Sequence, residues 1–400
     1  MTISRTLDHA APGDTTSDPI NPDLAKLLEA AGLNIAPTTG RGAQLVSKDG
    51  DPILDMIPGY GAAPLGHGPT SVTETVANVL GQDMPNLVQP EFSNITRMLA
   101  RRLQGLAPME VDRVHFATTG SESVEIALNS ARLATDRLRF IAAVNGSHGK
   151  SVGGLSVTYT EEDNQFAQLA GTIFVPFGDI DAMAEALEED GDTIAAVILE
   201  PIQAFGGVHL PPEGYLQQVR ALCDTHGVIL IFDEIFTGIG RTGHLFATEW
   251  TGVEPDMLLL GKALGGGAMP ISACLFGPRA RTKSLFFQHM SMHVGSVYAA
   301  TAANAMLDNL LANDRAMIAS IARLGTELAE VHARLCRAFP ALIKEMRGKG
   351  LLHGIEFAPS TRVRSGGHGA VLELARAMDK LPELVTGNLL SRGVRVAPAG

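Results

Sequence analysis

The chain has 400 residues, of which 45% are hydrophobic and 18% charged, and its formal net charge is −12 at pH 7. This length exceeds what one small core normally supports, and the acidic balance argues against nucleic acid or an anionic membrane as a partner. There is no apolar run of membrane-span length, the N-terminus lacks a signal-peptide core, and the three cysteines lie far apart. We therefore expect a cytoplasmic enzyme of two or more subdomains, without a disulfide framework or a metal site.

The N-terminal part of the chain is predicted to contribute to a small domain. Residues 1–20 are polar and expected to be disordered. Within residues 21–70 we expect a short helix at 22–31 and a hairpin with strands at 43–47 and 52–56. A segment rich in glycine and proline follows, in which regular structure is not expected.

Short apolar strands alternate with helices over residues 71–300, which predicts one large α/β domain. The strands are continuous apolar runs, which indicates a mostly parallel sheet covered by helices on both faces. The predicted strands are 113–117, 139–144, 171–175, 195–199, 228–232, 257–260 and 272–276. Residues 301–400 are expected to complete the small domain, with a helix to about residue 338, a strand at 351–357, a helix at 370–392 and a strand at 394–397.

Two of these strands end at side chains suited to chemistry. Asp233 follows the strand at 228–232, and Lys262 follows the strand at 257–260. Strand ends of a parallel sheet gather at the edge where ligands bind. A desolvated lysine can form a Schiff base, and a carboxylate is the usual partner of a pyridinium nitrogen. The pair indicates pyridoxal 5'-phosphate (PLP).

The alternative for the acidic pair Asp233-Glu234 is a magnesium site of the nucleotide-binding type. Such a site needs a phosphate-binding loop, and the one candidate, around Lys150-Ser151, has Val144 where the first glycine is required. The sequence therefore argues against nucleotide binding. The alternative for Lys262, a surface lysine, is disfavoured by the apolar run before it and the glycines after it.

A second candidate site lies between the strand at 113–117 and a helix expected to begin near Glu122. The intervening residues include Gly120 and Ser121. Backbone N–H groups at a helix start, with hydroxyls beside them, can hold a phosphate. The alternative is an ordinary cap formed by Ser121. Together with the downstream acid and lysine, the phosphate interpretation is favoured.

These motifs belong to an ordered set along the chain: LGHGP, TTGSESVEIAL, HGKS, EPIQ, PPEGYL, DEIFTGIGRTG, PDMLLLGKALGGG and RGKGL. Through this set, over about residues 43–398, the chain resembles the class III (ornithine, acetylornithine, GABA and ω-amino acid) aminotransferases, of PLP-dependent fold type I. The resemblance implies an α/β fold, with a mostly parallel central sheet and flanking helices plus a smaller α+β domain from both chain ends. It also implies a homodimer whose active sites lie at the subunit interface.

The resemblance assigns roles to the matched positions. Lys262 and Asp233 would be the catalytic residues: the lysine would hold PLP as a Schiff base and carry a proton, and the acid would pair with the pyridine nitrogen. Ile235 would pack on one face of the ring. The positions implied for cofactor binding are Gly120, Ser121, His148, Asp233, Ile235, Lys262 and Ser296, and Tyr60 matches a position on the substrate side.

Several positions depart from the family pattern. The aromatic residue usual before His-Gly is Ser147, and the glutamine of the usual DEIQTG is Phe236. The glutamate that follows EPIQG in ornithine and GABA enzymes is replaced by Phe205, and the threonine expected to reach the partner subunit's phosphate is Val297. The segment that usually supplies an arginine for the substrate carboxylate is not matched before Gly400. These departures leave a less polar pocket.

We therefore expect a PLP-dependent aminotransferase of specialised metabolism. It would move an amino group from a donor amino acid or amine to a carbonyl acceptor by a ping-pong mechanism. One alternative is a PLP enzyme that does not transaminate: an epimerase or racemase, a decarboxylase, or an enzyme that forms carbon–carbon bonds. The other is a degenerate, non-catalytic paralogue, against which the retained Lys262 and Asp233 argue.

Overall fold

The computed structural model divides into two compact units by its internal contacts. Unit 1 draws on Met1–Pro58, Gly66–Gly68 and Phe357–Pro398, and unit 2 on Gly59–Leu65 and Pro69–Glu356. The segments expected as disordered (1–20) and as a first helix (22–31) lie outside the described residues, apart from Pro22. The structure describes residues 21–22, 35, 37–87, 91–160, 165–282, 291–358 and 381–397.

Unit 1 joins the two ends of the chain in one small sheet. The strand order is β1 (Thr39–Arg41), β2 (Gln44–Val46), β3 (Pro52–Asp55) and β13 (Val394–Arg395), with helix α13 (Leu381–Leu390) before the last strand. The predicted hairpin is β2 and β3, and β13 pairs parallel to β3. Asp55, buried at the end of β3, accepts hydrogen bonds from His67 Nε2 (2.8 Å) and Arg395 Nη1 (3.1 Å). The smaller α+β unit from both chain ends is thereby confirmed.

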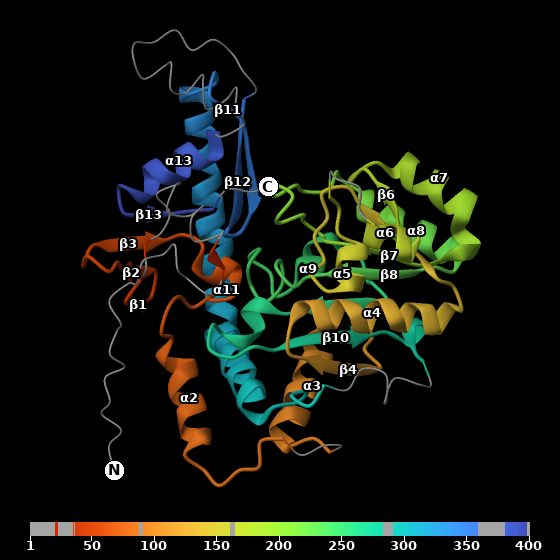
Figure 1. The fold of residues 1–400 in the computed structure, drawn as a ribbon, viewed down its shortest axis with the longest axis horizontal. Helices are drawn as coiled ribbons and strands as arrows, with labels where there is room; N and C mark the ends of the chain where they lie inside the picture. Colours follow the sequence, from red (N-terminus) through yellow and green to blue (C-terminus); the bar gives the residue numbers. More distant parts are fainter. Residues whose placement is uncertain are drawn as a thin grey trace. The chain divides into compact units, whose positions relative to one another are not determined.

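Unit 2 is built on a seven-stranded sheet (Figure 1). In this sheet β10 runs opposite to the other six strands, so the mostly parallel sheet is confirmed. The strand order is β4 (Arg113–Ala117), β10 (Ser272–Phe276), β9 (Met257–Leu260), β8 (Ile229–Asp233), β7 (Ile194–Leu199), β5 (Arg139–Ala143) and β6 (Ile173–Val175).

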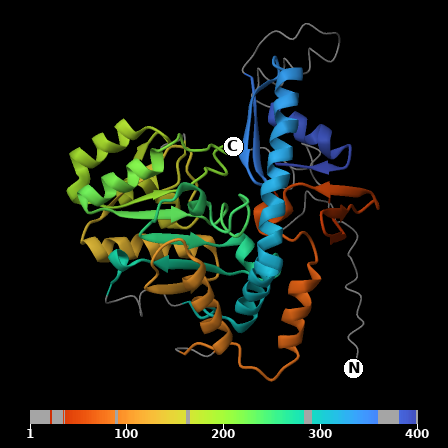
Figure 2. The same ribbon diagram turned by 180° about the vertical axis from the view of Figure 1, so that it is seen from behind.

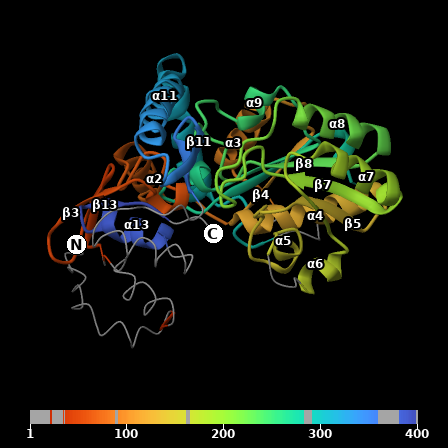
Figure 3. The same ribbon diagram turned by 90° about the horizontal axis from the view of Figure 1, so that it is seen from above.

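Helices cover both faces of this sheet, which explains the continuous apolar strands. Side chains along a strand point alternately to its two faces. In β7, Ile198 packs in the cluster that includes α4 (Gly120–Thr135), whereas Leu199 packs in the cluster that includes α8 (Tyr215–His226). Figure 3 shows α4 and α8 on opposite sides of the sheet. Both faces of the strand are therefore buried, and neither tolerates polar residues.

The remaining helices of unit 2 include one long element, α11 (Val297–Ala338), which is interrupted over residues 312–315. Helix α11 packs on α2 (Thr70–Leu80), α3 (Asn94–Leu106) and β11 (Ile343–Lys349) (Figure 2). Residues up to Glu356 therefore belong to unit 2. The sequence predicts instead that the small domain resumes at residue 301. The other described elements are η2 (Pro58–Gly61), α5 (Val152–Ser156), α6 (Gln165–Ala170), α7 (Ile180–Asp190), η3 (Gly191–Thr193), α9 (Ala247–Thr251), η4 (Lys262–Gly265), η5 (Pro278–Ala280) and β12 (Leu352–Phe357). Among these described helices, none has the length and apolar character that crossing a bilayer requires.

Candidate active site

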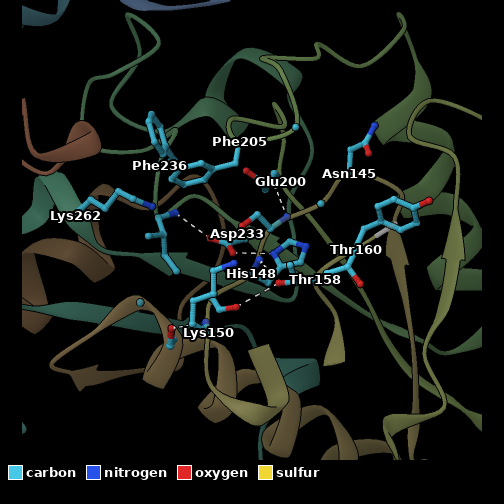
Figure 4. A pocket seen from close by; sticks show the side chains of 18 residues that line it. Asn145, His148, Lys150, Thr158, Thr160, Glu200, Phe205, Asp233, Phe236 and Lys262 are labelled. Carbon is cyan, nitrogen blue, oxygen red and sulfur yellow. Dashed lines mark hydrogen bonds and ion pairs between the residues drawn. The ribbon is translucent and has the colours of Figure 1, made fainter. Parts of the chain in front are cut away.

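A cavity of about 660 Å³ lies in unit 2, where the parallel strands end (Figure 4). Its lining comes from the segments that follow β4, β5, β7, β8 and β9. The predicted positions that line it are Gly120, Ser121, His148, Asp233, Ile235 and Lys262. The parallel sheet therefore gathers in one place six residues that lie up to 142 positions apart, from Gly120 to Lys262.

Asp233 lies at the bottom of this cavity and is paired with a histidine. Its Oδ2 accepts a hydrogen bond from His148 Nδ1 at 2.8 Å, and its Oδ1 accepts one from the backbone N–H of Ile235 at 3.0 Å. Both side chains are buried, and His148 Nε2 has no partner among the described residues. Because a buried carboxylate is costly unless its oxygens are hydrogen-bonded, these contacts hold the side chain of Asp233 in position.

Lys262 enters the same cavity from the turn that follows β9. Burial lowers the pKa of its amine, against the opposing effect of the nearby carboxylates of Asp233 and Glu200. Its backbone φ is 39°, a left-handed conformation that is unfavourable for a residue with a side chain. The fold therefore holds an amine that is more readily neutral, and hence nucleophilic, than a surface lysine.

The start of α4 forms a small polar cradle at another side of the cavity. Thr119, and not Ser121, caps the helix: its hydroxyl accepts from the N–H of Glu122, whose carboxylate accepts from the N–H of Thr119. The Ser121 hydroxyl instead accepts from the backbone N–H of Lys150 at 3.1 Å. A Cβ added to Gly149 would lie 2.5 Å from Ser121 Oγ, so the loop can approach the helix start only without a side chain there. This arrangement suits a phosphate.

Aromatic side chains form the other wall of the cavity. Lys262 Nζ lies 4.8 Å from the ring centroid of Phe236 and 5.4 Å from that of Phe205. The two phenylalanine rings meet edge to face at 5.5 Å, and Tyr60 stacks on Phe205 at 6.3 Å. Phe205 is 41% exposed and Tyr60 46%. Two of the positions that depart from the family pattern thus meet beside the lysine.

Two further predicted residues lie outside the cavity lining. Tyr60 stacks on Phe205, which is a lining residue. Ser296 precedes α11, where its hydroxyl donates to Asn86 Oδ1 at 2.9 Å and accepts from the N–H of Ala299. Within the part of the chain that the structure describes, Ser296 is therefore a helix-capping residue and is not brought together with the other cofactor positions.

Glu234, the second member of the acidic pair, points away from the cavity. Its carboxylate accepts the backbone N–H groups of Ala247 and Thr248, at the start of α9, and burial raises its pKa to about 7. Because only Asp233 faces the cavity, the two acids do not form a joint magnesium site. Asp233 therefore lines the cavity, whereas Glu234 holds the start of α9 through its hydrogen bonds.

Glu200 lines the cavity although the sequence did not mark it as a site residue. It follows the buried strand β7 and accepts two backbone N–H groups through its two oxygens. The signal available in the sequence was the polar pair of the EPIQ motif, placed directly after an entirely apolar strand.

The residues present fit PLP. The cradle of Gly120 and Ser121 offers a helix start and a hydroxyl for the phosphate, Asp233 offers a buried carboxylate for the ring nitrogen, and Lys262 offers a desolvated amine for the aldehyde. Ile235 is packed tightly beside the cradle, since a Cβ on Gly120 would lie 2.9 Å from its Cδ1. Each chemical end of the cofactor thus has a matching group.

Comparison with known proteins agrees with this assignment. The family described as aminotransferase class-III matches residues 29–400. The aminotransferase PigE of Serratia sp. (strain ATCC 39006) is 37% identical over 349 residues, covering 84% of this chain but only 40% of PigE. An amine transaminase from an uncultivated Pseudomonas species, solved with PLP bound, is 30% identical with a TM-score of 0.79, covering 92% of this chain and 88% of that one. Ornithine aminotransferase of Toxoplasma gondii ME49 is 28% identical with a TM-score of 0.79, covering 91% and 83%.

Proposed function

This chain belongs to the class III aminotransferase family, whose members use PLP, and on that premise we propose that it moves an amino group from a donor amino acid or amine to a carbonyl acceptor in two successive half-reactions. The observation that supports this most directly is the convergence of Lys262, Asp233 and the cradle at Ser121 on one cavity. A lysine or an acid alone would not support aminotransferase activity.

Each of these residues has a task that follows from its surroundings. When bound, PLP supplies a conjugated ring that accepts the electron pair left on the substrate Cα. Lys262 Nζ, kept readily neutral by burial, would hold the cofactor through its aldehyde and, once displaced from it by the substrate amine, would take up and return the proton of the substrate Cα. Asp233, oriented by His148, would keep the ring nitrogen of the bound cofactor protonated.

We propose that the substrate carries an apolar group, in keeping with an enzyme of specialised metabolism. Phe205 and Phe236 lie beside Lys262 Nζ, where the reacting carbon must come. Among the described lining residues the lysines are Lys150 and Lys262, and there is no arginine that could bind a carboxylate group of the substrate. The wall thus favours apolar contact over ion pairing.

We also propose that the protein acts as a homodimer, in which Ser296 approaches the phosphate site of the partner subunit. The support is that Ser296 lies outside the cavity lining of its own chain and directly precedes Val297, which stands where the family has the threonine that reaches the partner subunit's phosphate. Sedimentation analysis tests the dimer, and Ser296→Ala should weaken PLP binding only if the dimer forms.

One half-reaction separates transamination from its alternatives. Adding a donor amine without an acceptor should convert bound PLP to pyridoxamine phosphate, which is detected by absorbance and by mass spectrometry of the released cofactor. Loss of CO₂, or exchange of the Cα proton without pyridoxamine phosphate, would instead identify a decarboxylase or a racemase. A protein that binds no PLP would be a non-catalytic paralogue.

A further inference from the structure

The function proposed above leaves the EPIQ motif, residues 200–203, without a task. Its two polar side chains are almost fully enclosed: Glu200 is 5% exposed and Gln203 is 2% exposed. Buried polar groups are costly unless they are hydrogen-bonded, so their partners show what they hold. Those partners lie on two different loops at the cavity.

The two oxygens of Glu200 bind one loop each. Oε1 accepts the backbone N–H of Ser147 at 3.0 Å, and the next residue is His148, which holds Asp233. Oε2 accepts the backbone N–H of Ala204 at 3.0 Å, and the next residue is Phe205, which lies beside Lys262. The carboxylate of Glu200 therefore binds, in each of two loops, the residue that directly precedes a side chain of the site: His148 in one loop and Phe205 in the other.

The same two loops also touch each other directly. Gln203 Nε2 donates to the carbonyl oxygen of Val144 at 2.7 Å. A Cβ added to Gly206 would lie 2.5 Å from the carbonyl oxygen of Asn145, so the backbones approach as closely as glycine allows. A shift of one loop must therefore be taken up by the other.

The charge of Glu200 depends on its neighbours. Burial is the largest influence and raises its pKa to about 7. His148 opposes this rise, Asp233 adds to it, and the two bonded N–H groups oppose it. Lys262 is the further charged group that faces it. The carboxylate that joins the loops is therefore close to its titration point at neutral pH.

We propose that Glu200 is a positioning residue that couples the two sides of the cavity, setting where His148 holds Asp233 and where Phe205 stands beside Lys262. The coupling of the loops rests on the geometry alone, whereas its effect on the reaction rests on the proposed function. The two parts are tested by different measurements.

Amide hydrogen exchange on the full-length, PLP-loaded protein tests the coupling. In Glu200→Ala, exchange at Ser147 and Ala204 should rise by about 10- to 100-fold, the effect of losing a hydrogen bond to a charged group. Glu200→Gln, which keeps one strong acceptor, should release at least one of the two. Glu234→Gln is the matched control, since Glu234 is an equally buried carboxylate with two backbone donors. Its exchange should rise at α9 and not at the two loops.

The kinetic measurement uses the donor half-reaction and its pH profile. Glu200→Gln should raise KM for an apolar amine, because Phe205 moves, and should also shift the pH dependence of the cofactor absorbance, because His148 moves. Glu234→Gln should change neither while lowering stability. Unchanged exchange at both loops in Glu200→Gln, or a uniform rise over the whole chain with unchanged KM and pH profile, would overturn the proposal. If no amine reacts even with the wild-type protein, the proposed function fails, and the exchange result still decides the coupling.

Discussion

The two sides of the cavity are held in different ways. On the side where we propose that the cofactor binds, Asp233 and His148 are buried and hydrogen-bonded to each other. On the side where we propose that the substrate binds, Phe205 and Tyr60 keep about half of their surface exposed and stack on each other. Buried paired groups tolerate little change, whereas exposed rings can be exchanged at small cost to the fold. Substitutions on the first side should thus alter the chemistry, and those on the second the choice of substrate.

The largest effect is expected where both sides meet, at Lys262. Lys262→Ala should remove covalent attachment of the cofactor and lower the rate by at least about 10²- to 10⁴-fold, the usual worth of one proton-transfer group. Borohydride reduction followed by mass spectrometry provides the measurement. Lys150→Ala, which removes the neighbouring lining lysine, should still trap the cofactor at residue 262. A cofactor adduct in Lys262→Ala would contradict the assignment.

On the cofactor side, Asp233→Asn should lower kcat of the donor half-reaction by about 10²- to 10³-fold, comparable to removing one electrostatic stabiliser from an active site. The amide keeps the size of the side chain but no longer carries the charge that holds the ring proton. KM for the amine should change little. An effect confined to KM would place Asp233 on the substrate side instead.

On the proposed substrate side, Phe205→Ala should lower kcat/KM for hexylamine by about 10-fold, mainly through KM, since fully burying a phenylalanine is worth ~1.5–3 kcal/mol and only the exposed part of this ring is left for the substrate to cover. Isopropylamine, which offers the ring little apolar surface, should be affected much less. Phe339→Ala serves as a control for an exposed phenylalanine outside the cavity lining. A wild-type preference for an ω-amino acid over the amine of equal length would contradict the apolar wall.

The smallest effect is expected from restoring the family's aromatic residue next to His148. Ser147→Phe should tighten PLP binding by about 2- to 10-fold, because offset stacking of rings contributes ~0.5–1.5 kcal/mol. The backbone N–H that Glu200 holds is unchanged by this substitution. Fluorescence titration of the apoprotein measures the change. Weaker binding would show that the ring position is already filled.

The sheet could be predicted from the sequence because its strands are apolar without interruption. The bounds of β4, β9 and β10 are those expected. Strand β11, IKEMRGK, was missed because only Ile343 is buried and the strand pairs with β12 alone. The interruption of α11 near Asn313 could not be predicted, because no proline or glycine lies there to mark it in the sequence.

The site could be predicted in part, by the same logic. Asp233 and Lys262 follow apolar runs, so each was visible locally. The contact of Phe205 with Phe236, and that of Glu200 with Ser147, join segments that lie far apart in the chain, and neither leaves a local pattern. Such pairs become visible only when the fold brings the strand ends together.

The two buried glutamates also make folding a reaction that consumes protons. Glu200 and Glu234 each have a pKa of about 7 in the folded protein, against an ordinary value of 4.5. Between these values the folded chain binds protons that the unfolded chain has released, so their contribution to stability is complete below about pH 4.5 and is lost as the pH rises through 7. When Glu234→Gln unfolds in a weakly buffered solution at pH 6, it should therefore release fewer protons than the wild-type protein.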